Sequence, residues 1–341
     1  MPIYVLGVID SGGWIEFGQI GFADPYGEKT YVKTMPYGSI SMVVCEMDEW
    51  NINEGNKVDL LNKLLEHQKI LEKIMQKQFI LPAKFGTTLE NEHDVIAVLS
   101  QYFPSLKSGI AEMKDYIEID VVVTWDTTAE VKKIAEDDDE IKKLKLKVEK
   151  LPQTERGKKI IEVGMRLEEK LDEKRKGIEK VIFDTLKTHC IDRVDHDRLE
   201  DRMVINSSFL LKKAVEPTFF DVIDKLDQKL DGTLRFKCIS PLPPHSFKTI
   251  VINKINPHEL KEAMNLFDVT TKTTIEQLKE KNRQLIKKMH PDKTRKADSA
   301  AEFDKLNKSY KLLTSMLHSG NSLFSSAENK NFHVLEFKGG E

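Results

Sequence analysis

The tetrapeptide His290-Pro291-Asp292-Lys293 separates two stretches of sequence that both have helical periodicity. Before it, apolar residues recur on one side of a helix, at Ile275, Leu278, Leu285, Ile286 and Met289. After it, apolar residues recur at spacings of three and four, at Phe303, Leu306, Tyr310, Leu313 and Leu317. Because proline disfavours helical geometry at the residue before it, the first helix is expected to end at Pro291. The sequence therefore predicts an antiparallel helical hairpin with His290, Asp292 and Lys293 at its tip.

The side of the first helix opposite its apolar residues is basic, with Lys279, Lys281, Arg283, Lys287 and Lys288. An acid–base role for His290 and Asp292 is rejected, because they lie two residues apart on an exposed turn without a pocket to shift their pKa values. The tip and the basic helix together are predicted to be a binding site.

This arrangement, from about residue 256 to residue 317, resembles a J domain, the module that stimulates the ATPase of DnaK-type chaperones. Residues 266–269 stand where the family ends its first helix, and residues 303–310 where it has its core-facing third helix. The resemblance implies that a DnaK-type chaperone is bound by His290, Pro291, Asp292, Lys293, Lys287, Lys288 and Arg283. Two features depart from the family: Asn282 replaces a usual tyrosine, and no clear fourth helix follows Leu317.

The composition describes a globular protein of two or three domains. The chain has 341 residues, 40% hydrophobic and 32% charged, with a formal net charge of -3, so no general attraction to nucleic acid or membranes is implied. Three cysteines, far apart and without a CxxC pair, fit a reducing cytoplasm and no disulfide framework. The N-terminus has no basic segment typical of a signal peptide, and no apolar run approaches the ~20 residues of a membrane span.

Strands alternating with helices predict the rest of the architecture. Residues 3–9 are apolar on both faces, like a central strand, and strands are also predicted at residues 31–34, 39–45, 116–124, 203–211, 234–239 and 249–252. Helices are predicted near residues 58–75, 95–102, 154–186 and 216–230, and the charged residues 130–150 indicate a solvated helical arm. The predicted class is α+β: two ferredoxin-like α/β domains joined by a helical arm, then an all-α helical hairpin.

The predicted division of the chain follows these elements. An N-terminal α/β domain covers residues 1–126, and the charged arm with the long helix covers residues 127–190. The remainder of the second α/β domain is placed at residues 191–255, the J-like domain at residues 256–318 and a tail at residues 319–341.

Residues 2–252 resemble the gas vesicle protein F/L family, accessory proteins of gas vesicle formation. The similarity is carried by His67 and by residues 4–8, 81–89, 164–167, 174–176, 206–211 and 240–247, in that order. Residues 238–241 depart from it, because the family more often has a Gly-Pro pair before the double proline. The resemblance implies two α/β domains and a role in vesicle assembly.

No residue set predicts catalysis, a cofactor or a metal site. The most metal-like group is His189, Cys190, Asp192, Asp195, His196 and Asp197, but its spacing matches no standard site. A polar loop between a helix and a strand is the favoured interpretation. Ser207 and Ser208 lack a nucleophile-elbow pattern, and nothing assembles a nucleophile, a base and oxyanion donors. We therefore expect a protein that is not an enzyme.

The resulting hypothesis is a cytoplasmic or vesicle-associated assembly factor. Its partners would be gas vesicle shell and accessory proteins and a DnaK-type chaperone, with no nucleic acid and no membrane. Two alternatives remain open at this point: a minor structural component of the vesicle whose J-like tail no longer couples to a chaperone, and a general J-protein co-chaperone.

Overall fold

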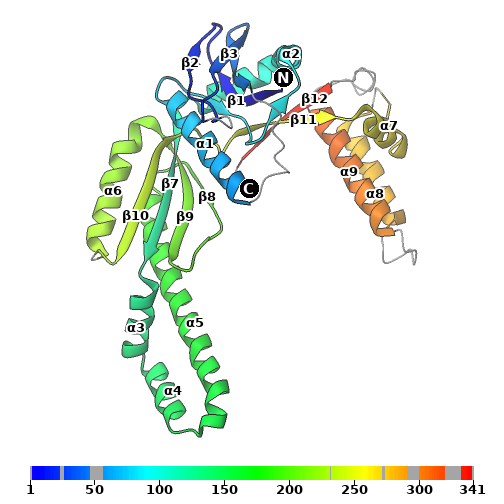
Figure 1. Ribbon diagram of the computed structural model, residues 1–341. Helices are drawn as coiled ribbons and strands as arrows, with labels where there is room; N and C mark the ends of the chain where they lie inside the picture. Colours follow the sequence, from blue (N-terminus) through cyan, green and yellow to red (C-terminus); the bar gives the residue numbers. More distant parts are fainter. Residues whose placement is uncertain are drawn as a thin grey trace. The chain divides into compact units, whose positions relative to one another are not determined.

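The structure, a computed structural model (Figure 1), describes residues 2–23, 27–46, 57–230, 232–270, 273–289, 299–318 and 332–339. Residue contacts divide the chain into two units. The first comprises residues 1–110 and 248–338, and the second is built on residues 111–247.

The first unit contains an antiparallel sheet with strand order β2-β3-β4-β1-β5, and β6 also pairs with β1. Its elements are β1 (Ile3–Ile9), β2 (Glu16–Gly18), β3 (Val32–Tyr37), β4 (Ile40–Glu46), α1 (Lys57–Met75), β5 (Leu81–Pro82), β6 (Thr88–Leu89) and α2 (Glu92–Met113). Strand β1 is buried along its whole length, as the sequence predicted. The expected ferredoxin-like alternation is wrong for this domain, because four strands precede the first helix.

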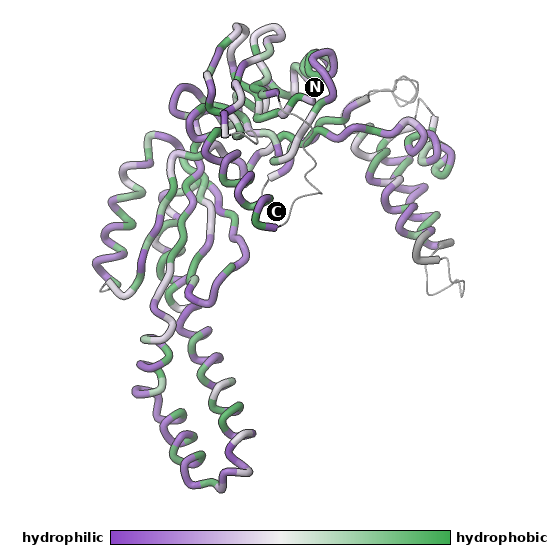
Figure 2. The backbone as a smooth tube through the Cα atoms, in the orientation of Figure 1, coloured by the Kyte–Doolittle hydropathy of each residue, from purple (hydrophilic) through white to green (hydrophobic). Residues whose placement is uncertain are grey.

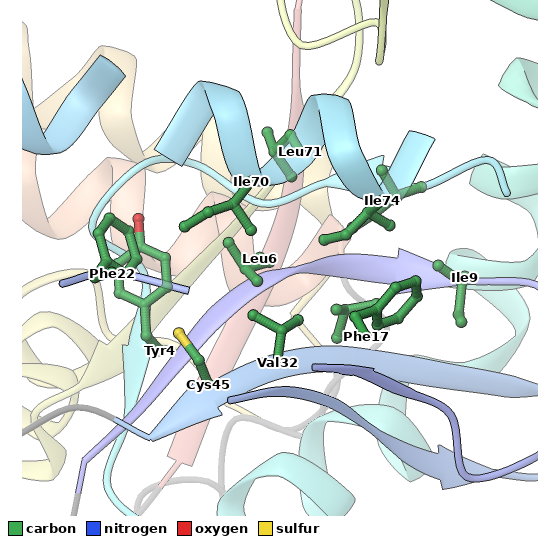
Figure 3. Packing of buried hydrophobic residues seen from close by; sticks show 12 residues of the cluster. Tyr4, Leu6, Ile9, Phe17, Phe22, Val32, Cys45, Ile70, Leu71 and Ile74 are labelled. Atoms are coloured by element: carbon green, nitrogen blue, oxygen red, sulfur yellow. The ribbon is translucent and has the colours of Figure 1, made fainter. Parts of the chain in front are cut away.

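Helix α1 packs its apolar side onto this sheet (Figure 3). Ile70, Leu71 and Ile74 of the helix meet Leu6 and Val32 of the sheet in one buried cluster. A polar contact lies at its border: Tyr4 Oη is 3.0 Å from His67 Nδ1 and accepts a hydrogen bond from the backbone N–H of Gly86 at 2.9 Å. His67 is therefore a satisfied, buried histidine of the core.

The second unit has a four-stranded antiparallel sheet of order β10-β7-β9-β8. Its elements are β7 (Tyr116–Trp125), α3 (Thr127–Asp137), α4 (Asp139–Glu149), α5 (Gln153–Leu186), β8 (Asp192–Asp195), β9 (Met203–Lys212), a 3-10 turn (Lys213–Val215), α6 (Glu216–Lys229) and β10 (Leu234–Leu242). The sequence analysis predicted a polar loop around residue 193, and this prediction was wrong. Residues 192–195 form edge strand β8, which pairs with β9.

Alternation along β7 gives this sheet two different faces. Ile117, Ile119, Val121 and Val123 are buried on one side. Helices α5 and α6 contact strands β9 and β10, and Phe209 of β9 lies between Phe183 of α5 and Phe219 of α6, with ring centroids 6.3 and 5.5 Å away. Glu118 and Asp120, at the alternate positions of β7, lie on the other face.

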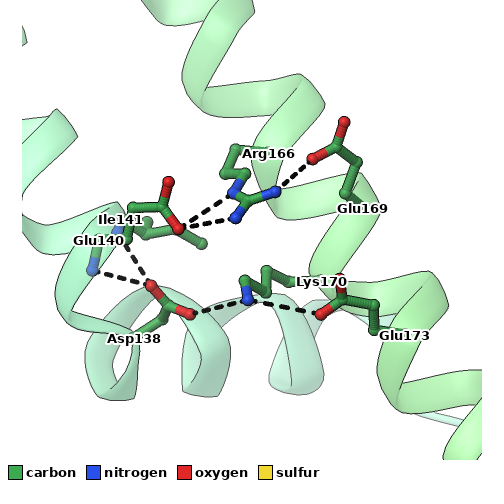
Figure 4. Close-up of polar contacts among 7 residues, drawn as sticks. All are labelled: Asp138, Glu140, Ile141, Arg166, Glu169, Lys170 and Glu173. Carbon is green, nitrogen blue, oxygen red and sulfur yellow. Dashed lines mark hydrogen bonds and ion pairs between the residues drawn. The ribbon is translucent and has the colours of Figure 1, made fainter.

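The charged region predicted as an arm consists of α3 and α4 folded against the outer half of α5. Ala135, Ile141 and Val163 form its small buried core. Asp138 divides α3 from α4 and caps α4, accepting hydrogen bonds from the N–H groups of Glu140 at 2.9 Å and Ile141 at 3.1 Å. Ion pairs hold the helices together at this point (Figure 4): Arg166 with Glu140 at 2.8 Å, and Lys170 with Asp138 at 3.8 Å.

The C-terminal part of the first unit is a two-stranded ribbon that encloses three helices in sequence. The order is β11 (Thr249–Ile255), α7 (Pro257–Leu266), α8 (Ile275–Met289), α9 (Ser299–His318) and β12 (Phe332–Lys338), with β11 and β12 antiparallel. Two corrections follow. Strand β11 was predicted to belong to the second α/β domain, but it pairs with β12. Residues 319–341 were predicted to be a tail, but they include strand β12.

The ribbon is attached to the N-terminal part of the first unit. The N–H of Lys84 donates to the carbonyl of Ile250 at 2.8 Å, and Tyr102 Oη donates to the carbonyl of His333 at 3.0 Å. Lys254 and Glu90 form an ion pair. Within the described ranges, no helix combines the length and the apolar character needed to cross a bilayer.

Candidate functional site

Helices α7, α8 and α9 pack around one hydrophobic cluster. Its members from the helices and the α7–α8 connection are Leu260, Ala263, Met264, Phe267, Val269, Leu278, Leu306, Leu313 and Met316. All five apolar positions predicted for the last helix either belong to this cluster or pack against it. Ile255 of β11 and Val334 of β12 complete the cluster. The predicted boundary at residue 256 therefore leaves out side chains on which the helical core depends.

The connection between α7 and α8 sets how the basic helix begins. Asp268 has φ +46°, the left-handed conformation that often ends a helix. Thr274 and Gln277 form a reciprocal pair at the start of α8: each backbone N–H donates to the other's side chain, at 3.0 and 3.3 Å. Lys281 donates to the backbone and side chain of Asp268. Lys281 thus stabilises this connection and does not belong to the open basic face, contrary to the sequence analysis.

The exposed side of α8 carries the remaining basic residues. Lys279, Arg283 and Lys287 are exposed and recur at intervals of four, so they share one side of the helix. Glu280 lies 3.8 Å from Arg283, so positive charge is in excess toward the C-terminal end. The predicted tip residues His290, Pro291, Asp292 and Lys293, and the side chain of Lys288, lie outside the described residues. Among the predicted site residues, the structure places Arg283 and Lys287 together on one surface.

Asn282 is an inward-facing position of α8 where the resemblance led us to expect tyrosine. Its Oδ1 is buried and has no hydrogen-bond partner among the described residues. An unsatisfied buried acceptor costs about 1–3 kcal/mol. We expect Asn282→Leu to raise the midpoint of thermal unfolding of the helical unit, measured by circular dichroism. Gln284→Leu, at an exposed position of the same helix, is the matched control. Equal effects of the two changes would contradict the assignment.

A second polar group, which the sequence analysis missed, lies in the second unit on the face of the sheet away from its helices. The Glu118 side chain is 0% exposed. Its Oε2 accepts from the N–H of Ser246 at 2.8 Å, and its Oε1 accepts from Ser246 Oγ at 2.7 Å. His245 Nε2 is 3.2 Å from the same Oε1. Burial, aided by nearby Asp120 and opposed by His245 and Ser246, raises the pKa of Glu118 to about 7.

Serine hydroxyls extend this group across two strands. Ser208 Oγ donates to Asp120 Oδ1 at 2.6 Å and lies 2.8 Å from His196 Nε2 and 3.2 Å from Ser246 Oγ. Carboxylate and imidazole atoms of Glu118, Asp120 and His245 come within 4.8 Å of one another. Both oxygens of Glu118 already accept hydrogen bonds, so we interpret the group as a polar network that fixes residues 243–247 on the sheet.

Two members of the metal-like group considered in the sequence, Asp195 and His196, contact different partners. Asp195 accepts from Ser207 Oγ at 2.7 Å and pairs with Arg193 at 2.8 Å, whereas His196 joins the Glu118 network through Ser208. The signal that could have revealed the network was local. Glu118 and Asp120 are two charged residues at alternate positions of a strongly apolar strand, a pattern that places two carboxylates on one face.

The raised pKa of Glu118 has a consequence for stability. Because the folded value of about 7 exceeds the ordinary value of 4.5, the folded protein holds a proton that the unfolded chain releases between these values. Protonated Glu118 therefore stabilises the folded chain, and this stabilisation is fully present below pH ~4.5. It is lost as the pH rises through ~7, which lowers the unfolding free energy by about 3 kcal/mol at 1.36 kcal/mol per pKa unit.

We expect Glu118→Gln to reduce the fall in unfolding free energy between about pH 5 and pH 8, measured by urea denaturation. Exposed Glu149→Gln is the control; an undiminished fall in Glu118→Gln would contradict the assignment.

Solved structures of known proteins share the fold of most of this chain. The crystal structure of the gas vesicle protein GvpF from Anabaena sp. aligns with a TM-score of 0.57 and 20% identity, covering 72% of this chain and 97% of that one. GvpF from Microcystis aeruginosa aligns with a TM-score of 0.53 and 20% identity, covering 72% and 98%. These likenesses concern the fold.

Sequence comparison agrees with the structural one. Gas vesicle protein F of Nostoc sp. is 27% identical over 191 residues, which is 55% of this chain and 77% of that protein. Gas vesicle protein F of Microcystis aeruginosa is 23% identical over 191 residues, 55% of this chain and 78% of that protein.

Fold and site together define a protein with mixed α/β units and a helical module that carries a basic surface. Residues 2–249 match the family described as gas vesicle synthesis protein GvpL/GvpF, and residues 264–317 match the DnaJ domain. The chain belongs to the gas vesicle synthesis protein GvpL/GvpF family and carries a DnaJ domain near its C-terminal end.

Proposed function

We propose that this protein is a gas vesicle assembly factor that binds vesicle proteins through its α/β units and recruits a DnaK-type chaperone through its DnaJ domain. The observation that carries the proposal is the presence of both family matches in one chain, at residues 2–249 and 264–317. Joining a client-binding part to a chaperone-recruiting part raises the local concentration of the chaperone at the client without any new contact. The proposed role is not enzymatic and involves neither nucleic acid nor a membrane.

The proposed chaperone site lies at the C-terminal end of α8. Arg283 and Lys287 are exposed there, and Lys288 and the tip residues His290, Pro291, Asp292 and Lys293 follow directly in sequence. A basic surface of this kind would steer the domain toward an acidic patch on the chaperone ATPase, and the tip would then dock. The packed core beneath α8 supports the proposal, because it holds the basic side chains on a rigid helix.

The element order of the second unit supports a ferredoxin-like arrangement there. The helices of the arm and α5 lie between β7 and β8, and α6 lies between β9 and β10. This is the strand-helix-strand-strand-helix-strand order, and β7 and β9 form the centre of the sheet.

Two experiments together test the proposed function. First, the full chain is incubated with purified vesicle shell protein and a DnaK-type chaperone with ATP. Co-sedimentation of all three is expected, and absence of shell protein from the complex would favour a general co-chaperone. Second, vesicles are isolated and washed. An assembly factor should be released, whereas stoichiometric retention would favour a minor structural component. A complex without shell protein, or retention on washed vesicles, would contradict the proposal.

A further inference from the structure

The outer half of α5 has two apolar sides. Val163 and Leu167 face α3 and α4 in the core of the arm. Ile161 and Met165, on another side, are 65% and 60% exposed, and Ile160, between the two sides, is 57% exposed. Ile161 and Met165 are four residues apart and therefore neighbours on the helix surface. Figure 2 shows hydrophobic and hydrophilic segments alternating along this helix. Three large apolar side chains of α5 thus lie mostly exposed, outside the buried core of the arm.

Two glycines lie beside these side chains. Gly157 and Gly164 are four residues before and three residues after Ile161, and a Cβ atom at either would meet no atom within 4 Å. A glycine inside a helix costs about 1 kcal/mol relative to alanine, and no neighbour within the described residues comes close enough to require one here. Glycines at this spacing permit the close approach of another backbone.

Positive charge is in excess at this end of the arm. Residues 142–159 contain eight lysine and arginine residues but two acidic ones, in a chain whose net charge is -3. Of the acidic groups at the α3–α4 junction, Asp138 and Glu140 are paired with Lys170 and Arg166 of α5 (Figure 4), and only Asp139 pairs with a residue of this basic stretch, Lys142, at 3.5 Å among the described residues. In the described part of the chain, lysines 143, 145, 147, 150 and 158 have no carboxylate oxygen within 4.0 Å. The exposed apolar side chains therefore share this end of the arm with positive charge that these ion pairs leave uncompensated.

We propose that this arm-end surface, formed by Ile160, Ile161, Met165, Gly157 and Gly164 with the basic residues 142–159, binds an acidic amphipathic helix of a partner protein. The apolar side of the partner helix would cover the three exposed side chains, and its backbone would approach α5 at the glycines. Its carboxylates would meet the lysines of α4 and early α5. The surface is inferred from the arm alone, so its test is independent of chaperone coupling by the DnaJ domain.

The test measures binding of a labelled helical peptide to the full chain by fluorescence anisotropy. The probe is a peptide of about 20 residues, ~30 Å long, with leucines on one side and glutamates beside them. One control peptide has lysines in place of the glutamates, and another has the same acidic composition in scrambled order. We expect the acidic amphipathic peptide to bind at least ~tenfold more tightly than either control, and more weakly at high salt.

Variants of the chain locate the site. Ile161→Gln combined with Met165→Gln should weaken binding at least ~tenfold. The matched control is Leu199→Gln, which changes a side chain that is 79% exposed and lies outside the arm; it should bind as the wild type does. Gly164→Leu should weaken binding by blocking close approach, while the thermal midpoint of the chain stays the same or rises because helix propensity improves.

Three outcomes would overturn the inference. One is binding of all peptides alike. Another is binding to vesicles of anionic lipid, sensitive to the same variants, without binding of the acidic peptide. The third is self-association of the chain in analytical ultracentrifugation that the Ile161 and Met165 changes abolish, which would make a second copy the occupant.

Discussion

His290→Gln is expected to abolish stimulation of a DnaK-type chaperone's ATPase while leaving the fold of the chain intact. The residue directly follows α8 in sequence and is proposed to act by docking, so its loss should remove a contact with the partner. The measurement is steady-state ATP hydrolysis by the chaperone, with wild-type and variant chains, together with circular dichroism of each chain. Equal stimulation by the wild type and His290→Gln would contradict chaperone recruitment through this tip.

Reversing the charge of Lys287 tests, in the same ATPase assay, whether exposed positive charge attracts the chaperone. Lys287→Glu should weaken stimulation strongly at low ionic strength and less at high ionic strength, because exposed charges act through a screened field. Lys311→Glu, an exposed lysine on α9, is the matched control and should have little effect. No stimulation by the wild-type chain at any ionic strength would favour the structural-component alternative.

Val334→Asp, a change in strand β12, should unfold the helical unit although Val334 lies in none of its helices. Val334 is 1% exposed and belongs to the same cluster as Leu306 and Leu313. The change removes about 1.5–3 kcal/mol of apolar burial and adds a buried carboxylate without a partner, which costs several kcal/mol more. Hydrogen exchange should accelerate in α9 and β12 and stay unchanged in β7 and β9. Stimulation of the chaperone should be lost together with the fold.

Lys338→Asp is the control for this change, because it places the same charge at an exposed end of the same strand. It should leave exchange in α9 as in the wild type. Unchanged exchange in Val334→Asp would show that the ribbon does not support the helices. The comparison with His290→Gln is informative, since that variant should lose stimulation without any change in exchange.

Periodic spacing of apolar residues along the sequence was enough to predict the helices and strands that bury one regular side. Helix α5, strands β7 and β9 and the apolar positions of α9 are all where the sequence placed them, because each buries one regular side. The edge strand β8 was missed because three of its four residues, Asp192, Arg193 and Asp195, are polar and exposed. Strand β9 supplies the hydrogen bonds that make residues 192–195 a strand.

Long-range pairing explains the other differences. Strand β12 pairs with β11, for example Thr249 with Lys338. The residues of one strand do not show in their own sequence which distant strand they pair with. The Glu118 network depends on Ser246, 128 residues away, so neither segment reveals it alone. In the first domain, strands β2 (residues 16–18), β5 (residues 81–82) and β6 (residues 88–89) were not predicted, because two or three residues are too few to show a period. The tip residues remain a prediction, and so does the chaperone-binding role of Arg283 and Lys287, which are exposed on one side of α8.

The ribbon also makes the DnaJ domain exchangeable. Ile255 pairs with Phe332, so the chain leaves β11 and re-enters β12 at points about 5 Å apart, the spacing of neighbouring strands. A segment whose two ends are that close can be removed or replaced while the two strands stay paired, and a replacement would have to cover Ile255 and Val334, which the helices now bury. Joining β11 directly to β12 through an Asn-Gly turn would give a chain that keeps both anchors and lacks the module. The same point would accept another compact domain with adjacent termini, which makes the ribbon a grafting position for new activities on this scaffold.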